Sequence, residues 1–209
     1  MLILLPYYII NYEKKILIIA KDEIRIKALL QEYKRIARED GKMLYLKAAN
    51  LEDVEREYLY ITELPADENG FTNAYCGVSR EEFVKTVLPK LINHSKGIDL
   101  PKGYVPCTEF FLWEDDEIVG LFRIRHELND FLRAGAGHIG YGIKKEYRGK
   151  GYATKGLALT ITKAKEIIKE DEIYMSVHKD NPASLQVQLK NGAYIHHEDD
   201  KEYYTRIRV

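Results

Sequence analysis

The sequence predicts an α/β (α+β) fold in which helices pack on a mixed sheet. Length and composition give the first reason, because 209 residues with 45% hydrophobic and 31% charged side chains suit one sizeable globular domain. The second is the order of elements from Met43 onward, where strand-like runs alternate with segments of helical apolar spacing. The third is the final segment, where Ala193–His197 and Tyr203–Val209 are typical of an antiparallel pair.

Residues 1–42 differ from the rest and are expected to form an N-terminal extension of unknown role, ahead of a domain that spans 43–209. Tyr7–Tyr12 and Ile16–Ala20 are strand-like and flank a polar segment, which favours a hairpin. Asp22–Asp40 has apolar residues at helical spacing and predicts a helix that ends before a glycine.

Between Met43 and Gly103 the chain alternates between strand and helix signals. The expected elements are, in order, a strand at Met43–Ala48, a helix from its N-cap Asn50 to about Ile61, a loop at Pro65–Gly77, and a helix from the capping-box residues Ser79 and Glu82 toward Asn93. Pro89 falls inside the second helix, where its missing N–H and its ring should kink the helix or end it early.

The remaining chain begins with three strand candidates, and helices and strands then alternate. The expected elements are strands at Val105–Trp113, Glu117–His126 and His138–Lys144, a helix at Lys150–Lys169, a strand at Glu172–His178, and a helix at Ala183–Asn191 that Gly192 ends. A tight polar turn joins the first two strands, and Glu127–Gly137 is expected to be a loop.

Charge and cysteine content exclude several classes of protein. The formal net charge is −1, so no overall field attracts the chain to nucleic acid or to anionic lipid. Cys76 and Cys107 form no C-x-x-C motif and are too few for a disulfide framework, as in a reduced cytosolic protein. The apolar start at Met1–Ile10 is too short to span a bilayer. We therefore expect a soluble, cytoplasmic protein without nucleic-acid or membrane partners.

The segment from His138 to Thr154 carries a chemical signal, because a strand enters a turn that contains Gly149 and Gly151 and a helix leaves it. Glycine adopts backbone angles that side chains forbid, and it lets a ligand approach the backbone. The first N–H groups of a helix have no internal partner, and the helix dipole adds about half a positive charge there. Since Arg148 adds a full charge, as does Lys150 two residues later, a pyrophosphate is the expected occupant.

These residues resemble the GNAT superfamily of acetyltransferases, whose signature is Gln/Arg-x-x-Gly-x-Gly/Ala and is matched by Arg148-Gly-Lys-Gly-Tyr-Ala153. A second motif follows at the expected distance, in Met175–Ser184 and Leu189–Ala193. The run Arg125-His-Glu-Leu-Asn129, taken with His138–Ile143, further resembles a bacterial subgroup of predicted acetyltransferases whose substrate is not known to us. The resemblance covers about residues 43–209.

The resemblance implies a mostly antiparallel central sheet with helices on both faces and a V-shaped splay between two parallel strands, His138–Lys144 and Glu172–His178. Acetyl-CoA would lie in that gap as co-substrate, and a primary amine of a small molecule or protein would attack its thioester directly, through a tetrahedral intermediate. No metal is implied, and a homodimer is mildly favoured. The implied contacts are Tyr141, Gly142 and Ile143 for the pantetheine arm, Arg148, Gly149, Lys150, Gly151, Tyr152, Ala153 and Thr154 for the pyrophosphate, and Asn181 and Ser184 for the cofactor generally.

The reaction needs a base to take a proton from the amine and prefers an acid to protonate the leaving thiolate. Family members often use a tyrosine as the acid, but Gln188 holds that position here, so the acid is unassigned. The candidate bases are His126 and His138, because an ordinary histidine pKa of about 6.5 suits proton pickup. Glu127 and Glu109 are the second choices for the base.

Most of these signals also have a structural interpretation. Asn181 could simply cap the following helix, and the two candidate histidines could be structural residues at strand ends. The G-x-G-x-x-G run at Gly135–Gly140 precedes its strand, so it fails as a dinucleotide fingerprint. His196 and His197 would point to opposite faces of a strand, which argues against a metal site. The missing tyrosine leaves a non-catalytic acetyl-CoA-binding or sensor module as the alternative to an enzyme.

Overall fold

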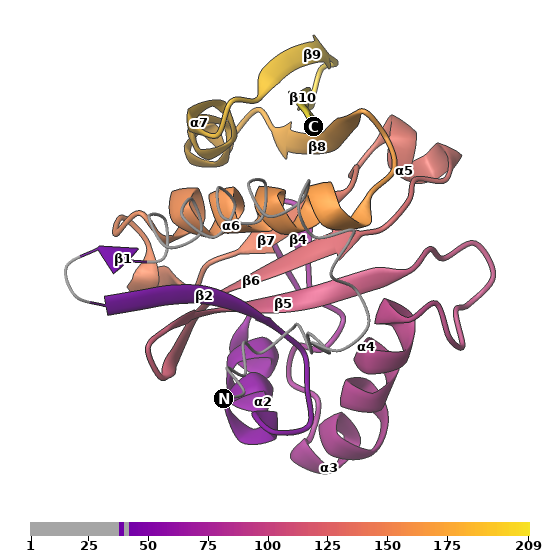
Figure 1. The fold of residues 1–209 in the computed structure, drawn as a ribbon, viewed down its shortest axis with the longest axis vertical. Helices are drawn as coiled ribbons and strands as arrows, with labels where there is room; N and C mark the ends of the chain where they lie inside the picture. Colours follow the sequence, from indigo (N-terminus) through magenta and orange to yellow (C-terminus); the bar gives the residue numbers. More distant parts are fainter. Residues whose placement is uncertain (1–37, 40–41) are drawn as a thin grey trace, which may run out of the picture. The chain divides into compact units, whose positions relative to one another are not determined.

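The computed structural model describes residues 38–39 and 42–209 (Figure 1). The chain divides into two compact units, Met1–Arg35 and Ile36–Val209, and all described residues belong to the second unit. The hairpin expected in the N-terminal extension, and most of its helix, lie outside the described residues. Arg38–Glu39 form strand β1, which pairs with Lys42 and Met43, so the helix expected over Asp22–Asp40 does not include these two residues.

Two antiparallel sheets form the framework, where a single mixed sheet was expected. The first has the order β1-β2-β5-β6-β7, with β2 at Lys42–Ala48, β5 at Cys107–Glu114, β6 at Glu117–Arg125 and β7 at Ile139–Gly142. The second has the order β8-β10-β9, with β8 at Glu172–His178, β9 at Tyr194–Glu198 and β10 at Glu202–Arg208.

The two sheets meet at a seam that His138 and Tyr174 form just before β7 and within β8. The His138 backbone N–H donates to the Tyr174 carbonyl at 2.7 Å, and the Tyr174 N–H donates to His138 Nδ1 at 3.0 Å. The His138 side chain thus takes the place of a backbone acceptor. The two sheets therefore meet without leaving the Tyr174 N–H unpaired.

Helices cover both faces of the five-stranded sheet (Figure 1). On one face, the core is built from α2 (Val54–Glu63), α3 (Arg80–Glu82), the π-helical turn η1 (Phe83–Val87) and α4 (Leu88–Ser95), packed against Phe111, Trp113 and Leu121. On the other face, α6 (Tyr152–Ile167) lies between the first sheet and α7 (Pro182–Lys190). A Cβ at Gly156 of α6 would fall 2.3 Å from the Phe122 ring, so this close approach needs a glycine.

Three segments differ from the sequence-based expectation. Asn50 caps a bend rather than a helix, since its Oδ1 accepts from the N–H groups of Glu52 and Asp53, and α2 begins only at Val54. The expected loop at Pro65–Gly77 contains a hairpin of β3 (Asp67–Glu68) and β4 (Phe71–Thr72). The expected loop at Glu127–Gly137 contains the short helix α5 (Asp130–Ala134), whose first turn Asn129 caps through Leu132 N–H at 2.8 Å.

The chain stays helical through Pro89, which neither breaks the helix nor ends it early. Ser79 Oγ accepts from Glu82 N–H at 3.2 Å, as the capping-box pattern predicts. The π-helical turn η1 then comes directly before α4, which carries Pro89 in its first turn. The wider turn shifts the hydrogen-bond register at the point where the proline ring would otherwise meet a carbonyl group.

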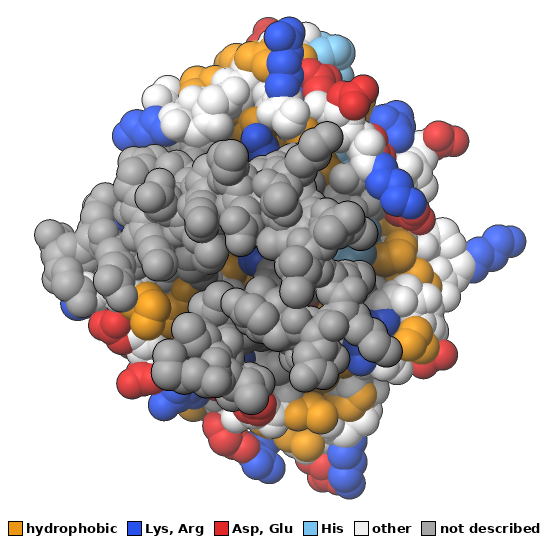
Figure 2. Space-filling view, viewed as in Figure 1, with side chains coloured by type: hydrophobic (Ala, Val, Ile, Leu, Met, Phe, Trp, Pro, Cys, Tyr) orange, Lys and Arg blue, Asp and Glu red, His pale blue; other side chains and the backbone are white. Residues whose placement is uncertain are grey.

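The described surface is mixed in charge. Figure 2 shows acidic and basic side chains intermingled on the described part of one face. Cys76 and Cys107 are both free. None of the described helices has the length and apolar character that crossing a membrane requires.

Candidate active site

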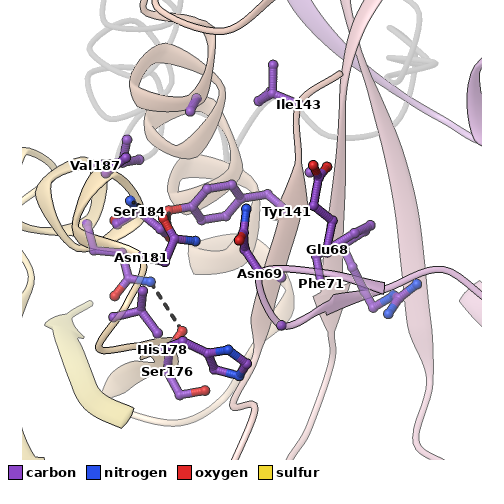
Figure 3. A pocket seen from close by; sticks show the side chains of 18 of the residues that line it. Glu68, Asn69, Phe71, Tyr141, Ile143, Ser176, His178, Asn181, Ser184 and Val187 are labelled. Carbon is purple, nitrogen blue, oxygen red and sulfur yellow. Dashed lines mark hydrogen bonds between the residues drawn. The ribbon is translucent and has the colours of Figure 1, made fainter. Parts of the chain in front are cut away.

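A cavity of about 760 Å³ lies along β7, which is one of the two edge strands of the first sheet. Its walls come from the β3–β4 hairpin, from β6 and β7, from the turn into α6, and from the end of β8 with α7 (Figure 3). All the predicted cofactor contacts except Lys150 line it. These are Tyr141, Gly142, Ile143, Arg148, Gly149, Gly151, Tyr152, Ala153, Thr154, Asn181 and Ser184.

The turn into α6 has the geometry of an anion-binding helix start. Gly149 and Gly151 have φ values of 76° and 83°, in the left-handed region that favours glycine. A Cβ added at Gly149 would meet no described atom within 4 Å, so the backbone is open to a ligand there. Within the part of the chain that the structure describes, the N–H groups of Tyr152, Ala153 and Thr154 find no acceptor. Those groups carry the positive end of the helix dipole.

The charge of Arg148 is matched by a carboxylate of the β3–β4 hairpin. Arg148 Nε donates to the Ile143 carbonyl at 2.8 Å, and its guanidinium forms an ion pair with Glu68. Lys150 is not a lining residue, although its Nζ lies 5.7 Å from the centre of the ring of Tyr147, which is one. Arg148 therefore shapes the turn and fastens it to the hairpin, whereas the sequence suggested a free charge at the helix start.

The side chain of Tyr141 points from β7 toward α7. Its ring stacks on Phe122 with 5.5 Å between centroids, and its Oη lies 2.7 Å from Ser184 Oγ. Burial raises the pKa of Tyr141 to about 12, so the hydroxyl keeps its proton at pH 7. The neighbouring Gly140 and Gly142 leave the opposite face of β7 without side chains, and Phe71 packs over it.

The helix α7 supplies the wall on the other side. Asn181 Oδ1 accepts from Ser184 N–H at 3.1 Å, so the capping role of Asn181 is confirmed, and both side chains also line the cavity. Gln188 is buried and bound to the second sheet, since it donates to the Ser176 carbonyl and accepts from Thr205 Oγ1 at 2.6 Å. An amide cannot donate a proton as an acid.

The candidate bases lie away from the cavity lining. His138 is fully buried in the seam, its Nε2 is 3.4 Å from Glu170, and burial lowers its pKa. His126 Nε2 lies 2.8 Å from Thr108 Oγ1, and burial lowers its pKa too. Glu127 is exposed. None of the three belongs to the residues that line the cavity.

Glu109, Arg123 and Arg125 share the face of β5 and β6 that turns toward the hairpin. Glu109 is buried, and its Oε1 accepts from Arg123 Nε at 2.5 Å. Both arginines line the cavity. Arg123 pairs across β6 and β7 with Gly140, which has no side chain to cover it. Sequence reasoning did not name Arg123, and it named Arg125 only within the run Arg125–Asn129 and without a role, because only the strand register reveals this opening.

His178 is the histidine on the cavity wall, and sequence reasoning did not single it out. It ends β8, and its Nε2 lies 3.3 Å from Glu202 Oε1 on β10. Its ring also packs against Gly70 of the hairpin. Its place within the second motif was the available signal. No group of three or more His, Cys, Asp or Glu side chains in the described region could hold a metal ion.

The family follows from the sequence profile of the acetyltransferase (GNAT) domain, which matches residues 44–194. That match covers well over half of the chain, and the chain therefore belongs to the GNAT acetyltransferases. No match was found among curated protein sequences.

Solved structures share the fold at low sequence identity. A probable acetyltransferase is 18% identical with a TM-score of 0.58, covering 79% of this chain and 92% of its own. The ribosomal L7/L12 alpha-N-protein acetyltransferase in complex with coenzyme A is 17% identical, with a TM-score of 0.56 and coverage of 79% and 94%. The Campylobacter jejuni N-acetyltransferase PseH in complex with acetyl coenzyme A is 18% identical, with a TM-score of 0.52 and coverage of 79% and 99%.

Proposed function

We propose that this acetyltransferase moves the acetyl group of acetyl-CoA directly to a primary amine, without an acyl-enzyme. The observation that carries the proposal is the start of α6, where left-handed glycines and unpaired N–H groups face a large cavity. Acetyl-CoA has a pyrophosphate that such a helix start can bind. Two of the similar structures hold coenzyme A or acetyl coenzyme A, which is consistent with that choice.

The open edge of β7 suits the pantetheine arm of the co-substrate. An edge strand has unpaired backbone groups, and amides of an extended ligand can pair with them. Since β7 and β8 belong to different sheets that meet at the seam, we place the arm in a V-shaped gap between them. The pyrophosphate then lies at Gly149–Thr154, with Asn181 and Ser184 on the α7 side.

We assign proton transfer to side chains on the cavity wall. The hydroxyl pair of Tyr141 and Ser184 lies beside Gln188, the position where family members often carry a tyrosine, and it can protonate the leaving thiolate. His178, held beside Glu202, is placed to take the proton from the amine. We prefer it to His126, His138 and Glu127, because these three do not line the cavity.

The test compares two glycines with similar backbone angles. Gly151→Ala and Gly97→Ala each place a Cβ at a positive φ, of 83° and 73°, and each should cost roughly 1–2 kcal/mol of stability. Only Gly151 lines the cavity, so only Gly151→Ala should weaken acetyl-CoA binding, by about tenfold or more in calorimetry. The wild type should also release CoA thiol saturably with at least one primary amine.

Two outcomes would contradict parts of the proposal. Equal acetyl-CoA affinity in both glycine variants would remove the α6 start as the binding site. Binding of acetyl-CoA without thiol release, across a broad amine panel, would support the non-catalytic sensor instead.

A further inference from the structure

The run Arg125-His-Glu-Leu-Asn129 contributes to the cavity wall through Arg125 and through the helix α5 that Asn129 caps, and the proposed reaction leaves the run without a role. Arg125 lines the cavity and donates through NH1 to the Gly137 carbonyl at 3.1 Å. Asn129 caps α5 and donates through Nδ2 to the Gly103 carbonyl at 2.9 Å. The helix α5 in turn places Phe131 and Leu132 on the cavity wall. The run therefore holds the Arg125 guanidinium at the cavity wall, beside the apolar side chains of Phe131 and Leu132.

Arg125 lies beside a second arginine, Arg123, and the two differ in their partners. Arg123 is paired with Glu109, whereas no ion pair joins Arg125 to a carboxylate within the described residues. Burial lowers the pKa of Arg125, with a smaller contribution from the neighbouring Arg123. The Arg123 side chain is only 15% exposed, so solvent screens these charges poorly. A partly buried guanidinium without a carboxylate is costly unless a ligand supplies the anion.

We infer that the acceptor is an amine that also carries an anionic group, a carboxylate or a phosphate, which Arg125 binds beside Arg123. This inference rests on the proposed acetyl transfer to an amine at the same cavity. A guanidinium binds either anion through parallel N–H donors.

The same charges would discriminate among acceptors. A polycationic acceptor would meet repulsion from the arginines, since the two carboxylates of the described lining, Glu68 and Glu202, already lie against Arg148 and His178, and Glu109 is buried against Arg123.

The experiment measures kcat/KM for matched acceptors with the full chain. The carboxylate series is ω-amino acids of increasing length from glycine, each compared with its own amide, and the phosphate pair is phosphoethanolamine and ethanolamine. We expect at least one anionic member to exceed its neutral partner by about 10- to 100-fold, mainly through KM. The pair that shows the preference identifies the anion.

Three variants assign the preference to Arg125. Arg125→Gln should abolish it, and Arg125→Lys should keep part of it because the charge remains. Arg133→Gln is the matched control, since Arg133 pairs with Glu170 and does not line the cavity, and it should keep the full preference. Unchanged acetyl-CoA affinity in calorimetry shows that each variant is folded and that the cofactor site is intact.

The inference is overturned if each neutral partner has the same kcat/KM as its acid, or if Arg125→Gln keeps the preference. In both cases the proposed acetyl transfer to an amine would still stand. If no acceptor is acetylated, calorimetry of each acid and amide with the CoA-loaded protein decides. Tighter binding of the acid, lost in Arg125→Gln, then supports the anion site although the catalytic proposal fails. Equal binding of acid and amide, or no binding of either, overturns the inferred anion site.

Discussion

At the scale of single residues, Glu57 on α2 has the environment least suited to its charge. It is fully buried, and it accepts from the Asn50 N–H at 3.1 Å and from Asn50 Nδ2 at 2.8 Å. Burial nevertheless raises its pKa from 4.5 to about 8. The folded protein thus holds this proton over a pH range in which the unfolded chain releases it, so stability falls as pH rises from 4.5 to about 8.

Glu57→Gln should remove this pH dependence. Gln keeps an oxygen acceptor for Asn50 but has no proton to lose, so the variant should gain stability relative to the wild type as pH rises, by up to about 1.4 kcal/mol per pH unit. Urea unfolding at pH 5, 6, 7 and about 8 measures this. Glu55→Gln is the control, because Glu55 is exposed on the same helix and pairs with Arg80. A constant difference between Glu57→Gln and the wild type at every pH would contradict the prediction.

At the scale of elements, the β3–β4 hairpin is tied by Glu68 and Arg148 to the turn into α6, where we propose that the pyrophosphate binds. Glu68→Gln should leave the Arg148 charge unmatched and so tighten acetyl-CoA binding by about two- to fivefold at low salt, and less at high salt. Calorimetry at two salt concentrations measures this. Glu63→Gln breaks a comparable pair with Lys144 outside the cavity lining and should have no effect. Weaker acetyl-CoA binding in Glu68→Gln would contradict this prediction. It would mean that binding needs the ion pair that holds the hairpin against the turn.

The sequence predicts the longer elements well, because their apolar spacing repeats over several turns or pleats. β8 has the bounds expected for it, and α6 lies within Lys150–Lys169. The hairpin was missed because each of its strands has two residues, too few for periodicity. Its turn residues, Asn69 and Gly70, do carry the signal of a type I′ turn, with φ values of 54° and 84°.

The candidate site was predictable only where one stretch of chain builds it. The turn at Arg148–Thr154 combines its glycines and its helix start within seven positions, so its motif is readable. Arg125 and His178 reach the cavity through strand register and through the meeting of two sheets, which single-sequence patterns do not encode. The bases His126 and His138 were chosen by their place at strand ends, and that place does not fix the face to which a side chain points.

At the scale of the whole described unit, His138 joins the two sheets through its own side chain. His138→Ala would leave the Tyr174 N–H without its acceptor, and this should cost about 1–3 kcal/mol of unfolding free energy. His138→Asn can restore an acceptor and should cost less. We expect folded samples of both variants to keep the wild-type pH dependence of kcat/KM. Loss of the acidic limb of that profile, with little loss of stability, would instead make His138 the base.

The strand order of the second sheet makes one wall of the cavity depend on β10. This is the last of the described strands in chain order. β10 lies between β8 and β9 and pairs with both, and its Thr205 holds Gln188 of α7. Until β10 emerges, β8 has no partner in its own sheet and α7 lacks that hydrogen bond. The turn at Arg148–Thr154, the proposed pyrophosphate site, is thus translated about fifty residues before β10 can complete the opposite wall. A nascent chain therefore has no complete cavity until β10, whose Glu202 belongs to the lining, has been made.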